Sequence, residues 1–391
     1  MSTRRYALVA GGGTGGHLVP ALAVARALGE GRGPGAVELV GARRGLDAEL
    51  LSGEGVPATL LPGRGITRRF GLRPLVANLG AVAGLAAAFA AAVVIVARRR
   101  PSVVVAMGGY ACVPTALAAA VMGIPVVLVN VDAVPGAANR LVGRFARCAA
   151  VAFEGTALPR SVVTGAPVRA VIVQGARPGP RDRASARDAL GLPGDRLVVA
   201  AVGGSLGSER LNTAVMGLAE LWASRPDVAL YHVVGRRDWS WAAQAVPGSR
   251  PGPGPGGLRY VQVPFERRMA LFYQAADIVV SRAGANTVAE LAVMGVPSIL
   301  VPLPGAPGDH QHANAAVLER VGAAVVLPDD RCSPARLAHE IDALVSDPDR
   351  LGAMRLAAGT VGRPDAVSAV AALARVHARP PRRGAQAAHA V

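Results

Sequence analysis

The stretch YALVAGGGTGGH, residues 6–17, decides the fold of this chain. Its first five residues are apolar and predict a short buried strand that runs directly into glycines. Gly11, Gly13 and Gly16 have the spacing GxGxxG, which lets backbone N–H groups and a helix N-terminus approach a diphosphate. A strand, a glycine-rich turn and a helix beginning near Pro20 therefore predict a Rossmann-like α/β unit at the start of the chain.

The same alternation of short apolar runs and longer helical stretches continues along the whole chain. Near-continuous apolar runs suit strands that are buried on both faces of a parallel sheet. In the first half the predicted strands are residues 6–10, 37–40, 103–107, 126–129 and 149–153. In the second half they are residues 197–202, 230–234, 260–263, 278–280 and 298–301. The fold class predicted is α/β, with two doubly wound parallel-sheet domains.

Length agrees with two domains, because 391 residues exceed what one hydrophobic core usually serves. We expect a first domain over residues 1–173 and a second over residues 188–362. Residues 174–187 turn to Pro, Gly and Arg and are interpreted as a linker. The tail, residues 379–391, is expected to be disordered.

Composition indicates a folded protein with large apolar cores, since 51% of the residues are hydrophobic and 17% are charged. The formal net charge is +16, and arginine supplies all of the Lys and Arg content. This charge would attract anionic partners, either nucleic acid or the anionic lipids of a membrane surface. Nucleic acid is disfavoured, because aromatic residues make up only 4% of the chain and no run interleaves them with arginines.

Three cysteines, Cys112, Cys148 and Cys332, are far apart and in no metal-binding spacing. They are interpreted as reduced structural thiols of a cytoplasmic protein. The first apolar run is too short for a secretory signal, so none is expected.

The segment from Pro74 to Ala97 contains one polar residue, Asn78, and is long enough to span a bilayer. It consists mostly of alanine and lies between two strands of one predicted sheet. A buried or surface-lying amphipathic helix is therefore favoured over a spanning one. The arginines 98–100 at its end could rest on lipid headgroups.

A second glycine-rich loop, GGSLG at residues 203–207, follows a predicted strand in the second half. Farther on, the turn before Ala285, Asn286 and Thr287 would offer the backbone N–H groups of a helix N-terminus to an anion. Glu290, one helical turn in, could accept both hydroxyls of a ribose. Its alternative is a solvated helix residue.

Histidines raise two further possibilities. His17 follows the last glycine of the first loop, where an imidazole could act as a general base or could be a buried structural residue. Asp309, His310 and His312 diverge along the backbone and find no other His or Cys cluster nearby, so no metal is expected. Gln311 is interpreted as a polar group for sugar hydroxyls.

Six motifs in order resemble those of the MurG family: GGGTGGH, MGGY at 107–110, GAPVR at 165–169, GGSLG, SRAGANTVAE at 281–290 and DHQ at 309–311. That family contains glycosyltransferases of the GT-B fold, with two Rossmann-like domains facing across a cleft. They move N-acetylglucosamine from UDP-N-acetylglucosamine to a membrane-anchored muramyl-pentapeptide diphosphate lipid, which makes lipid II for peptidoglycan. The resemblance runs from about Tyr6 to Ala324.

The resemblance implies a role for each matched position. The loop from Gly13 to His17 would face the acceptor diphosphate together with Gly108, Gly109 and Tyr110, with His17 as the catalytic base. The donor residues implied are Thr14, Gly15, Gly16, Asp132, Arg169, Ser205, Ala285, Asn286, Thr287, Glu290 and Gln311. Residues 363–378 would form a helix that returns to the first domain, and part of residues 67–100 would contact the cytoplasmic face of the membrane. No cofactor or metal is implied.

Three departures from the family pattern favour a divergent paralogue as an alternative. Residues 129–132 read VNVD where the family usually has His-Glu-Gln-Asn, Ala166 replaces a usual Asn, and Glu266 to Arg268 replace paired acids. A related enzyme with another lipid or secondary-metabolite acceptor, an NAD(P) oxidoreductase and a catalytically silent scaffold therefore stay as competing hypotheses.

Overall fold

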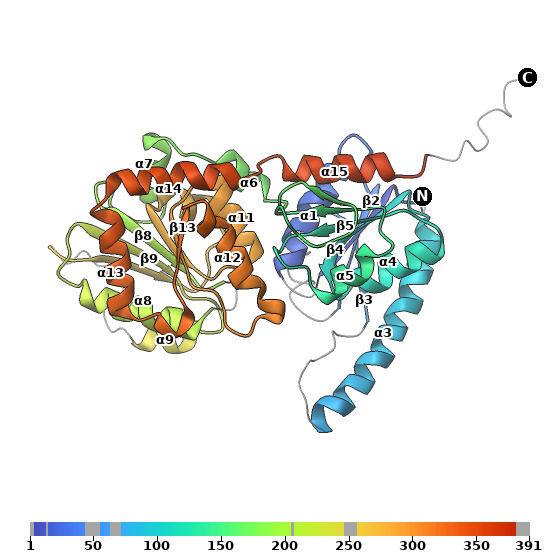
Figure 1. Cartoon of the computed structure of the whole chain (residues 1–391), viewed down its shortest axis with the longest axis horizontal. Helices are drawn as coiled ribbons and strands as arrows, with labels where there is room; N and C mark the ends of the chain where they lie inside the picture. The colour runs from blue at the N-terminus through green and yellow to red at the C-terminus, as the bar shows by residue number, and fades with distance from the viewer. Residues whose placement is uncertain are drawn as a thin grey trace, which may run out of the picture. The chain divides into compact units, whose positions relative to one another are not determined.

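The computed structural model describes residues 4–12, 15–43, 55–62, 72–204, 207–245 and 256–380. The chain divides into two compact units, each built around a parallel sheet (Figure 1). Unit 1 comprises residues 1–130, 135–167 and 365–391. Unit 2 comprises residues 131–134 and 168–364.

Unit 1 has, within the described residues, a seven-stranded parallel sheet in the order β3-β2-β1-β4-β5-β6-β7. Its strands are β1 (Ala7–Gly12), β2 (Val37–Ala42), β3 (Ala58–Leu61), β4 (Val103–Gly109), β5 (Val126–Asn130), β6 (Cys148–Val151) and β7 (Ser161–Val163). Its helices are α1 (Gly15–Gly29), α3 (Leu72–Arg99), α4 (Cys112–Val121), α5 (Ala137–Gly143) and α15 (Ala366–His377). The central strands β1, β4 and β5 are buried along nearly their whole length, as parallel strands covered on both faces must be.

Helix α3 corresponds to the long alanine-rich segment. Ala88, Ala92 and Val96, spaced four residues apart, are fully buried in the core of unit 1 and line one face of the helix. The N-terminal part of α3 extends away from the sheet (Figure 1). In the part of the chain that the structure describes, no helix combines the length and the apolarity that crossing a bilayer requires.

Helix α15 lies in unit 1 although it comes last in the chain. Val370, Ala371 and Ala374 are fully buried, and the helix packs against α1 and strands β4 and β5. Arg375 Nη2 donates to the carbonyl oxygen of Ala27 at 2.6 Å, which fixes the end of the helix to α1. This is the segment that the resemblance assigns to a returning C-terminal helix.

Unit 2 has a six-stranded parallel sheet in the order β10-β9-β8-β11-β12-β13 within the described residues. Its strands are β8 (Leu197–Val202), β9 (Val228–Val233), β10 (Arg259–Val263), β11 (Ile278–Ser281), β12 (Ser298–Leu300) and β13 (Ala324–Val326). Its helices are α6 (Ala170–Gln174), α7 (Pro180–Ala189), α8 (Glu209–Leu221), α9 (Trp239–Ala245), α10 (Met269–Ala275), α11 (Ala285–Met294), α12 (His310–Arg320), α13 (Pro334–Val345) and α14 (Pro348–Val361). Short 3₁₀ turns occupy Pro307–Asp309 and Asp329–Arg331.

The doubly wound α/β class is confirmed for both units, and each predicted strand is present. Helix α7 occupies much of the stretch whose composition suggested a linker. Pro180 opens this helix, and Asp182 Oδ2 accepts a hydrogen bond from the Gly179 N–H at 2.8 Å, so residues that resemble a loop in composition act here as helix-start signals. The predicted disordered tail lies almost entirely outside the described residues.

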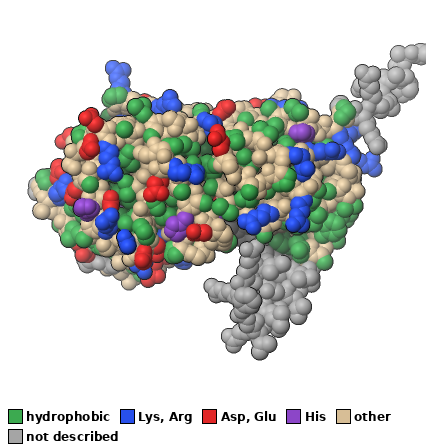
Figure 2. All heavy atoms as spheres, in the orientation of Figure 1, with side chains coloured by type: hydrophobic (Ala, Val, Ile, Leu, Met, Phe, Trp, Pro, Cys, Tyr) green, Lys and Arg blue, Asp and Glu red, His purple; other side chains and the backbone are tan. Residues whose placement is uncertain are grey.

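Arginine side chains gather on part of the surface of unit 1 (Figure 2). Arg140, Arg144 and Arg147 lie on and just after α5, and all three are exposed. Leu141 beside them is 40% exposed. Unit 1 therefore presents a basic face that also carries an apolar side chain.

Candidate functional site

The glycine-rich loops lie at equivalent places in the two units. In a parallel sheet all strands end at the same edge, so loops that follow different strands converge there. In unit 1, β1 leads into the first loop and α1, while β4 ends in Gly108 and Gly109. In unit 2, β8 leads into the second loop and α8. Gly13, Thr14 and Ser205, three of the predicted site residues, lie outside the described residues.

His17 lies in the first turn of α1 and packs against the backbone at the end of β4. A Cβ atom on Gly108 would lie 3.1 Å from His17 Cε1, and one on Gly109 would lie 3.1 Å from His17 Cδ2. Both glycines have positive φ, +89° and +75°. The imidazole therefore occupies the room that glycine leaves, and the structure brings together His17, Gly108 and Gly109 as the motifs predicted.

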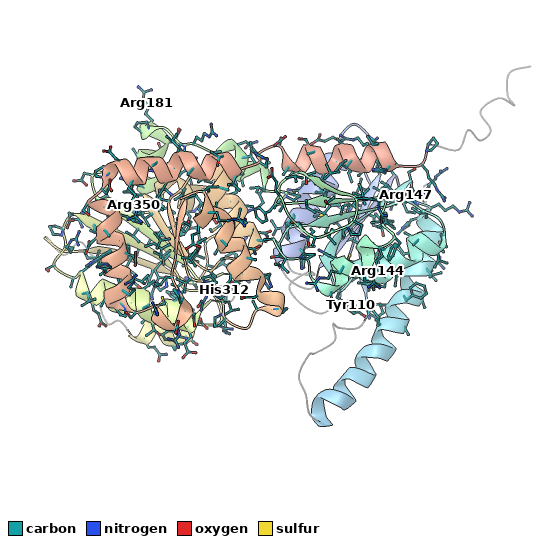
Figure 3. All side chains as sticks on the ribbon, in the orientation of Figure 1. Tyr110, Arg144, Arg147, Arg181, His312 and Arg350 are labelled. Atoms are coloured by element: carbon teal, nitrogen blue, oxygen red, sulfur yellow. The ribbon has the colours of Figure 1, made fainter. Side chains whose placement is uncertain are left out.

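Tyr110 has its hydroxyl engaged with the backbone. The hydroxyl donates to the carbonyl oxygen of Pro62 at 2.8 Å and lies 3.1 Å from that of Gly84 in α3. Burial raises the pKa of Tyr110, so it remains a donor. Figure 3 shows the side chain beside α3. Its hydroxyl ties α3 to the segment after β3, and its ring packs against the hydrophobic core of unit 1.

Asn139 on α5 lies next to His17 and was not singled out from the sequence. A Cβ atom on Gly108 would lie 3.3 Å from Asn139 Oδ1 and 3.1 Å from His17 Cε1, so both side chains reach the same glycine. Asn139 Nδ2 donates to Asn130 Oδ1 at 2.8 Å, and Asn139 Oδ1 is buried without a hydrogen-bond partner among the described residues. A buried amide oxygen of this kind is costly unless a ligand or water completes it.

Asn130 stands where the resembled family usually has glutamate. It is 1% exposed, at the end of β5. A neutral amide here avoids burying a charge, so the substitution agrees with the local environment. Asn139 lies nine residues after Asn130 in the sequence, and this spacing alone does not predict a contact. The fold brings the two side chains together.

In unit 2, Glu290 on α11 is held by two partners. Arg169 Nη2 and Nε donate to Glu290 Oε1 at 2.9 and 3.2 Å, and the Tyr273 hydroxyl donates to Oε2 at 2.9 Å. Burial, followed by the Glu290 carboxylate, raises the pKa of Tyr273 well above its usual range, so Tyr273 is a permanent donor. Glu290 is 7% exposed, which excludes the alternative of a solvated helix residue.

The N-terminus of α11 follows Gly284, whose extended backbone precedes Ala285. Ala285, Asn286 and Thr287 form the first turn, so their N–H groups have no partner within the helix. Asn286 Oδ1 is buried without a hydrogen-bond partner in the described part of the chain. This turn is suited to an anion or a hydroxyl-rich ligand.

Asp132 belongs to the short segment of unit 2 that follows β5. Asn314 on α12 donates to Asp132 Oδ1 at 2.9 Å, and its own Oδ1 accepts from the Ala133 N–H at 2.8 Å. Gln311, one turn earlier on α12, accepts from the Leu303 N–H through Oε1 at 2.9 Å. That bond uses the acceptor oxygen of the Gln311 amide, whose Nε2 is the donor.

Of the remaining departures, Glu266 has local partners and Ala166 is buried. Glu266 is 7% exposed, accepts from the Arg268 N–H and the Tyr231 hydroxyl at 2.6 Å each, and pairs with the Arg268 side chain. Glu266 thereby fixes the segment before α10. Ala166 is 5% exposed and simply buried.

Asp309 and His312 form an exposed pair, with His312 Nδ1 2.5 Å from Asp309 Oδ1, and His312 lies on α12 at the surface (Figure 3). Among the described residues, no group of three or more His, Cys, Asp or Glu side chains could hold a metal ion. The cysteines 112, 148 and 332 are buried free thiols.

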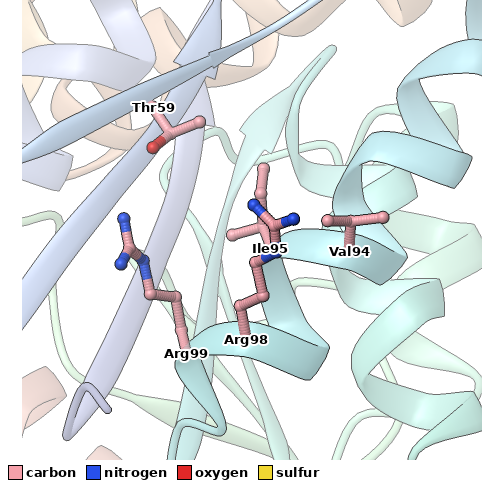
Figure 4. A pocket seen from close by; sticks show the side chains of 5 residues that line it. All are labelled: Thr59, Val94, Ile95, Arg98 and Arg99. Carbon is pink, nitrogen blue, oxygen red and sulfur yellow. The ribbon is translucent and has the colours of Figure 1, made fainter. Parts of the chain in front are cut away.

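A surface pocket in unit 1 is lined by Thr59, Val94, Ile95, Arg98 and Arg99 (Figure 4). Arg99 Nε pairs with the buried Glu38 carboxylate at 2.8 Å, and Thr59 also donates to Glu38. The pocket lies between the start of β3 and the end of α3, toward the edge where the strands begin. The glycine loops follow the opposite ends of the strands, so this pocket is separate from the candidate site.

The sequence matches two family models, described as the glycosyltransferase family 28 N-terminal domain over residues 7–151 and the glycosyltransferase family 28 C-terminal domain over residues 198–370. A protein of Alkalilimnicola ehrlichii named UDP-N-acetylglucosamine–N-acetylmuramyl-(pentapeptide) pyrophosphoryl-undecaprenol N-acetylglucosamine transferase is 42% identical over 376 residues, 95% of this chain and 99% of that protein. A protein of Desulforudis audaxviator with the same name is 38% identical over 370 residues, 93% of this chain and 96% of that one. The crystal structure of Acinetobacter baumannii MurG matches with a TM-score of 0.72 and 27% identity, covering 95% of this chain and 99% of that chain.

Proposed function

Because this chain belongs to the MurG family within glycosyltransferase family 28, we propose that it transfers N-acetylglucosamine from UDP-N-acetylglucosamine to a lipid-linked muramyl-pentapeptide diphosphate. The likeness to MurG and the two doubly wound units also confirm the GT-B fold class. The observation that carries the proposal is the likeness over 95% of the chain and 99% of a relative named for this reaction.

Unit 2 is proposed to bind the donor. Glu290 Oε1 accepts two hydrogen bonds from Arg169, whereas Oε2 accepts one from Tyr273 and retains acceptor capacity for a ribose hydroxyl. The first turn of α11 and the second glycine loop would bind the diphosphate, and Gln311 Nε2 would donate to the sugar. Asp132 and Ser205 also contact the UDP-sugar in this proposal.

Unit 1 is proposed to bind the acceptor diphosphate at the first loop, between the N-terminus of α1 and the Gly108–Gly109 turn. Gly15 and Gly16, in the first turn of α1, supply N–H groups that no helical partner uses. We propose that His17 removes the proton of the acceptor hydroxyl, since it is the titratable side chain that the fold packs against this turn.

The proposed chemistry is an inverting displacement. The acceptor hydroxyl forms a bond to the anomeric carbon as its proton passes to His17, and the bond to the UDP oxygen breaks. The leaving diphosphate gains negative charge, which the loop amides, the α11 N-terminus and the Arg169 guanidinium would stabilise. These groups supply the positive potential, so the proposed step uses no metal.

We also propose a peripheral contact with the cytoplasmic face of the membrane. The exposed side chains of Arg140, Arg144, Arg147 and Leu141 in unit 1 support it, because a basic surface with an apolar side chain suits anionic headgroups.

The test offers the purified protein UDP-N-acetylglucosamine and a short-chain muramyl-pentapeptide diphosphate lipid, and measures the disaccharide product. We expect product, and we expect His17→Ala to lower turnover about 100- to 10,000-fold, as loss of a general base does. Unchanged turnover in that variant would remove His17 from the proposed role. UDP binding without disaccharide would favour a different acceptor. The VNVD segment at 129–132, which departs from the family pattern, is the reason to consider one.

A further inference from the structure

Behind the second glycine loop, unit 2 contains a chain of buried polar side chains that the proposed chemistry does not use. Asn212 on α8 is 0% exposed, His232 on β9 is 1% exposed and Asp238 just before α9 is 4% exposed. Buried polar groups are retained only where their hydrogen bonds are satisfied, and each bond in this chain can be assigned a direction.

The donor and acceptor roles can be assigned from Asn212 onward. Its Nδ2 lies 2.9 Å from the Val234 carbonyl oxygen and 3.0 Å from Asp238 Oδ2, and both of these can only accept. Asn212 Oδ1 must therefore face His232 Nε2, at 3.0 Å, and that nitrogen must carry the proton. His232 Nδ1 then accepts from the Tyr260 hydroxyl at 2.9 Å.

The tautomer is stabilised by the surroundings. The described partners of the His232 ring are the neutral side chains of Tyr260 and Asn212, and Tyr260 stacks beside it with ring centroids 6.2 Å apart. Burial lowers the pKa of His232 to about 3, so the neutral form persists at physiological pH. His232 on β9 thus fixes the orientation of the Asn212 side-chain amide.

At its other end, this series of hydrogen-bonded side chains reaches the second glycine loop. Gly207 has φ of +96°, and a Cβ atom there would lie 2.5 Å from both Asp238 Oδ2 and the Val234 carbonyl oxygen. These two oxygens are the ones that Asn212 holds. The loop backbone at Gly207 therefore rests directly on the acceptors that Asn212 and His232 position.

A second contact fixes the end of the same loop. Buried Arg282 donates through Nε to Ser208 Oγ at 2.9 Å, and pairs through Nη1 with Asp329 at 2.6 Å. Ser208 is the residue after Gly207 and occupies the position just before the first turn of α8. The described ends of the loop are thus supported from β9 and from β11.

We propose that His232, acting through Asn212 and Asp238, is a positioning residue that fixes the backbone at Gly207, the last residue of the second glycine loop, and thereby the affinity for a nucleoside diphosphate. This inference rests on the proposed function, in which that loop binds the donor diphosphate. His232 would not touch the donor. Its effect should fall on binding of the diphosphate and leave the transfer step itself nearly unchanged.

The experiment compares two substitutions at one position. In His232→Phe the donor to Asn212 is lost, whereas in His232→Gln the side-chain amide can place an N–H near the position of Nε2. We expect His232→Phe to weaken UDP binding by up to about tenfold and to raise the KM for the UDP-sugar with kcat within about twofold, since the net contribution of one hydrogen bond limits what the displaced loop backbone can lose in binding. We expect His232→Gln to remain within about threefold of the wild type.

Two further arms separate positioning from a general loss of packing. Uridine lacks the diphosphate, so its binding should change far less than that of UDP in His232→Phe. Ile341→Val, which removes one methyl group from a fully buried side chain of α13, serves as the packing control. Equal effects of His232→Phe and Ile341→Val, equal losses for uridine and UDP, or an unchanged UDP affinity would overturn the inference.

The wild-type protein distinguishes the two proposals. If it binds UDP and His232→Phe binds UDP equally well, the positioning role fails and the proposed function stands. If the wild type does not bind UDP, the proposed function fails and this inference fails with it.

Discussion

At the scale of single residues, removing the Tyr273 hydroxyl tests whether the Glu290 carboxylate binds a ribose hydroxyl. Tyr273→Phe removes only the donor to Glu290 Oε2 and leaves a carboxylate held by Arg169 alone. We expect UDP to bind about five- to tenfold more weakly, because the oxygen proposed for a ribose hydroxyl is no longer fixed. Isothermal titration of UDP and 2′-deoxy-UDP measures the effect.

The 2′-deoxy ligand is the internal control for Tyr273→Phe. The wild type should prefer UDP, and the variant should lose part of that preference. A parallel loss for both ligands would mean that Tyr273 supports the fold of unit 2 and does not orient the carboxylate.

His232 also predicts how stability depends on pH. Its pKa falls from about 6.5 in the unfolded chain to about 3 in the fold. Between these values the unfolded state binds the extra proton, so the free energy of unfolding decreases as pH falls through this window. One such group contributes up to about 1.4 kcal/mol per pH unit.

The comparison for this prediction is His232→Gln, which does not titrate. Urea unfolding at pH 7 and pH 5 should show that the wild type loses more stability than the variant, by on the order of 2 kcal/mol over these two units. Identical losses in both proteins would show that His232 is already solvated in the fold.

The sequence nominated Arg169 and Glu290 separately, as a diphosphate contact and a ribose contact. Their pairing could not be predicted, because 121 positions separate them and only packing of α11 beside α6 brings them together. Tyr273, Asn139 and His232 were missed for a similar reason. Each lies in an apolar run or a helix where one polar residue gives no periodic signal, and its partner is distant in the chain.

At the scale of elements, the second glycine loop allows a matched pair of substitutions. Gly204 and Gly207 both have φ of +96°. Among the described residues, a Cβ atom on Gly204 meets nothing within 4 Å, whereas one on Gly207 meets Asp238 and Val234 at 2.5 Å. Both changes to alanine should cost about 1–2 kcal/mol from the backbone conformation.

Gly207→Ala should cost about 1–3 kcal/mol more than Gly204→Ala, because only Gly207 is overpacked against its neighbours. Denaturant unfolding measures the difference, and UDP titration should show a larger loss for Gly207→Ala. Equal stabilities in the two variants would mean that the loop can move away from Asp238 without cost.

The sequence predicted every interior strand of the two sheets in the described part of the chain, and one outermost strand, β10. The three that it missed, β3, β7 and β13, are outermost strands of three or four residues. All three residues of β7 are exposed. An edge strand is covered by fewer neighbours and does not need a continuous apolar run, so in these three short strands the pattern is too weak to distinguish from a loop.

At the scale of the whole molecule, the formal charge of +16 raises the question of whether total charge or its placement brings the protein to a membrane. Total charge attracts anionic surfaces from any side, but only a local group of arginines lies within a Debye length of headgroups at once. The exposed arginines 140, 144 and 147 of unit 1 form such a group beside Leu141. Each could contribute about 1 kcal/mol of binding.

We therefore expect the triple change of Arg140, Arg144 and Arg147 to glutamine to weaken binding to vesicles that contain phosphatidylglycerol on the order of ten- to a hundredfold at low salt. The matched control changes Arg181, Arg320 and Arg350, three exposed arginines of unit 2, and removes the same amount of charge. It should bind nearly as well as the wild type in a co-sedimentation assay. Equal weakening in both triples would assign membrane association to net charge, and the basic face of unit 1 would then have no special part in it.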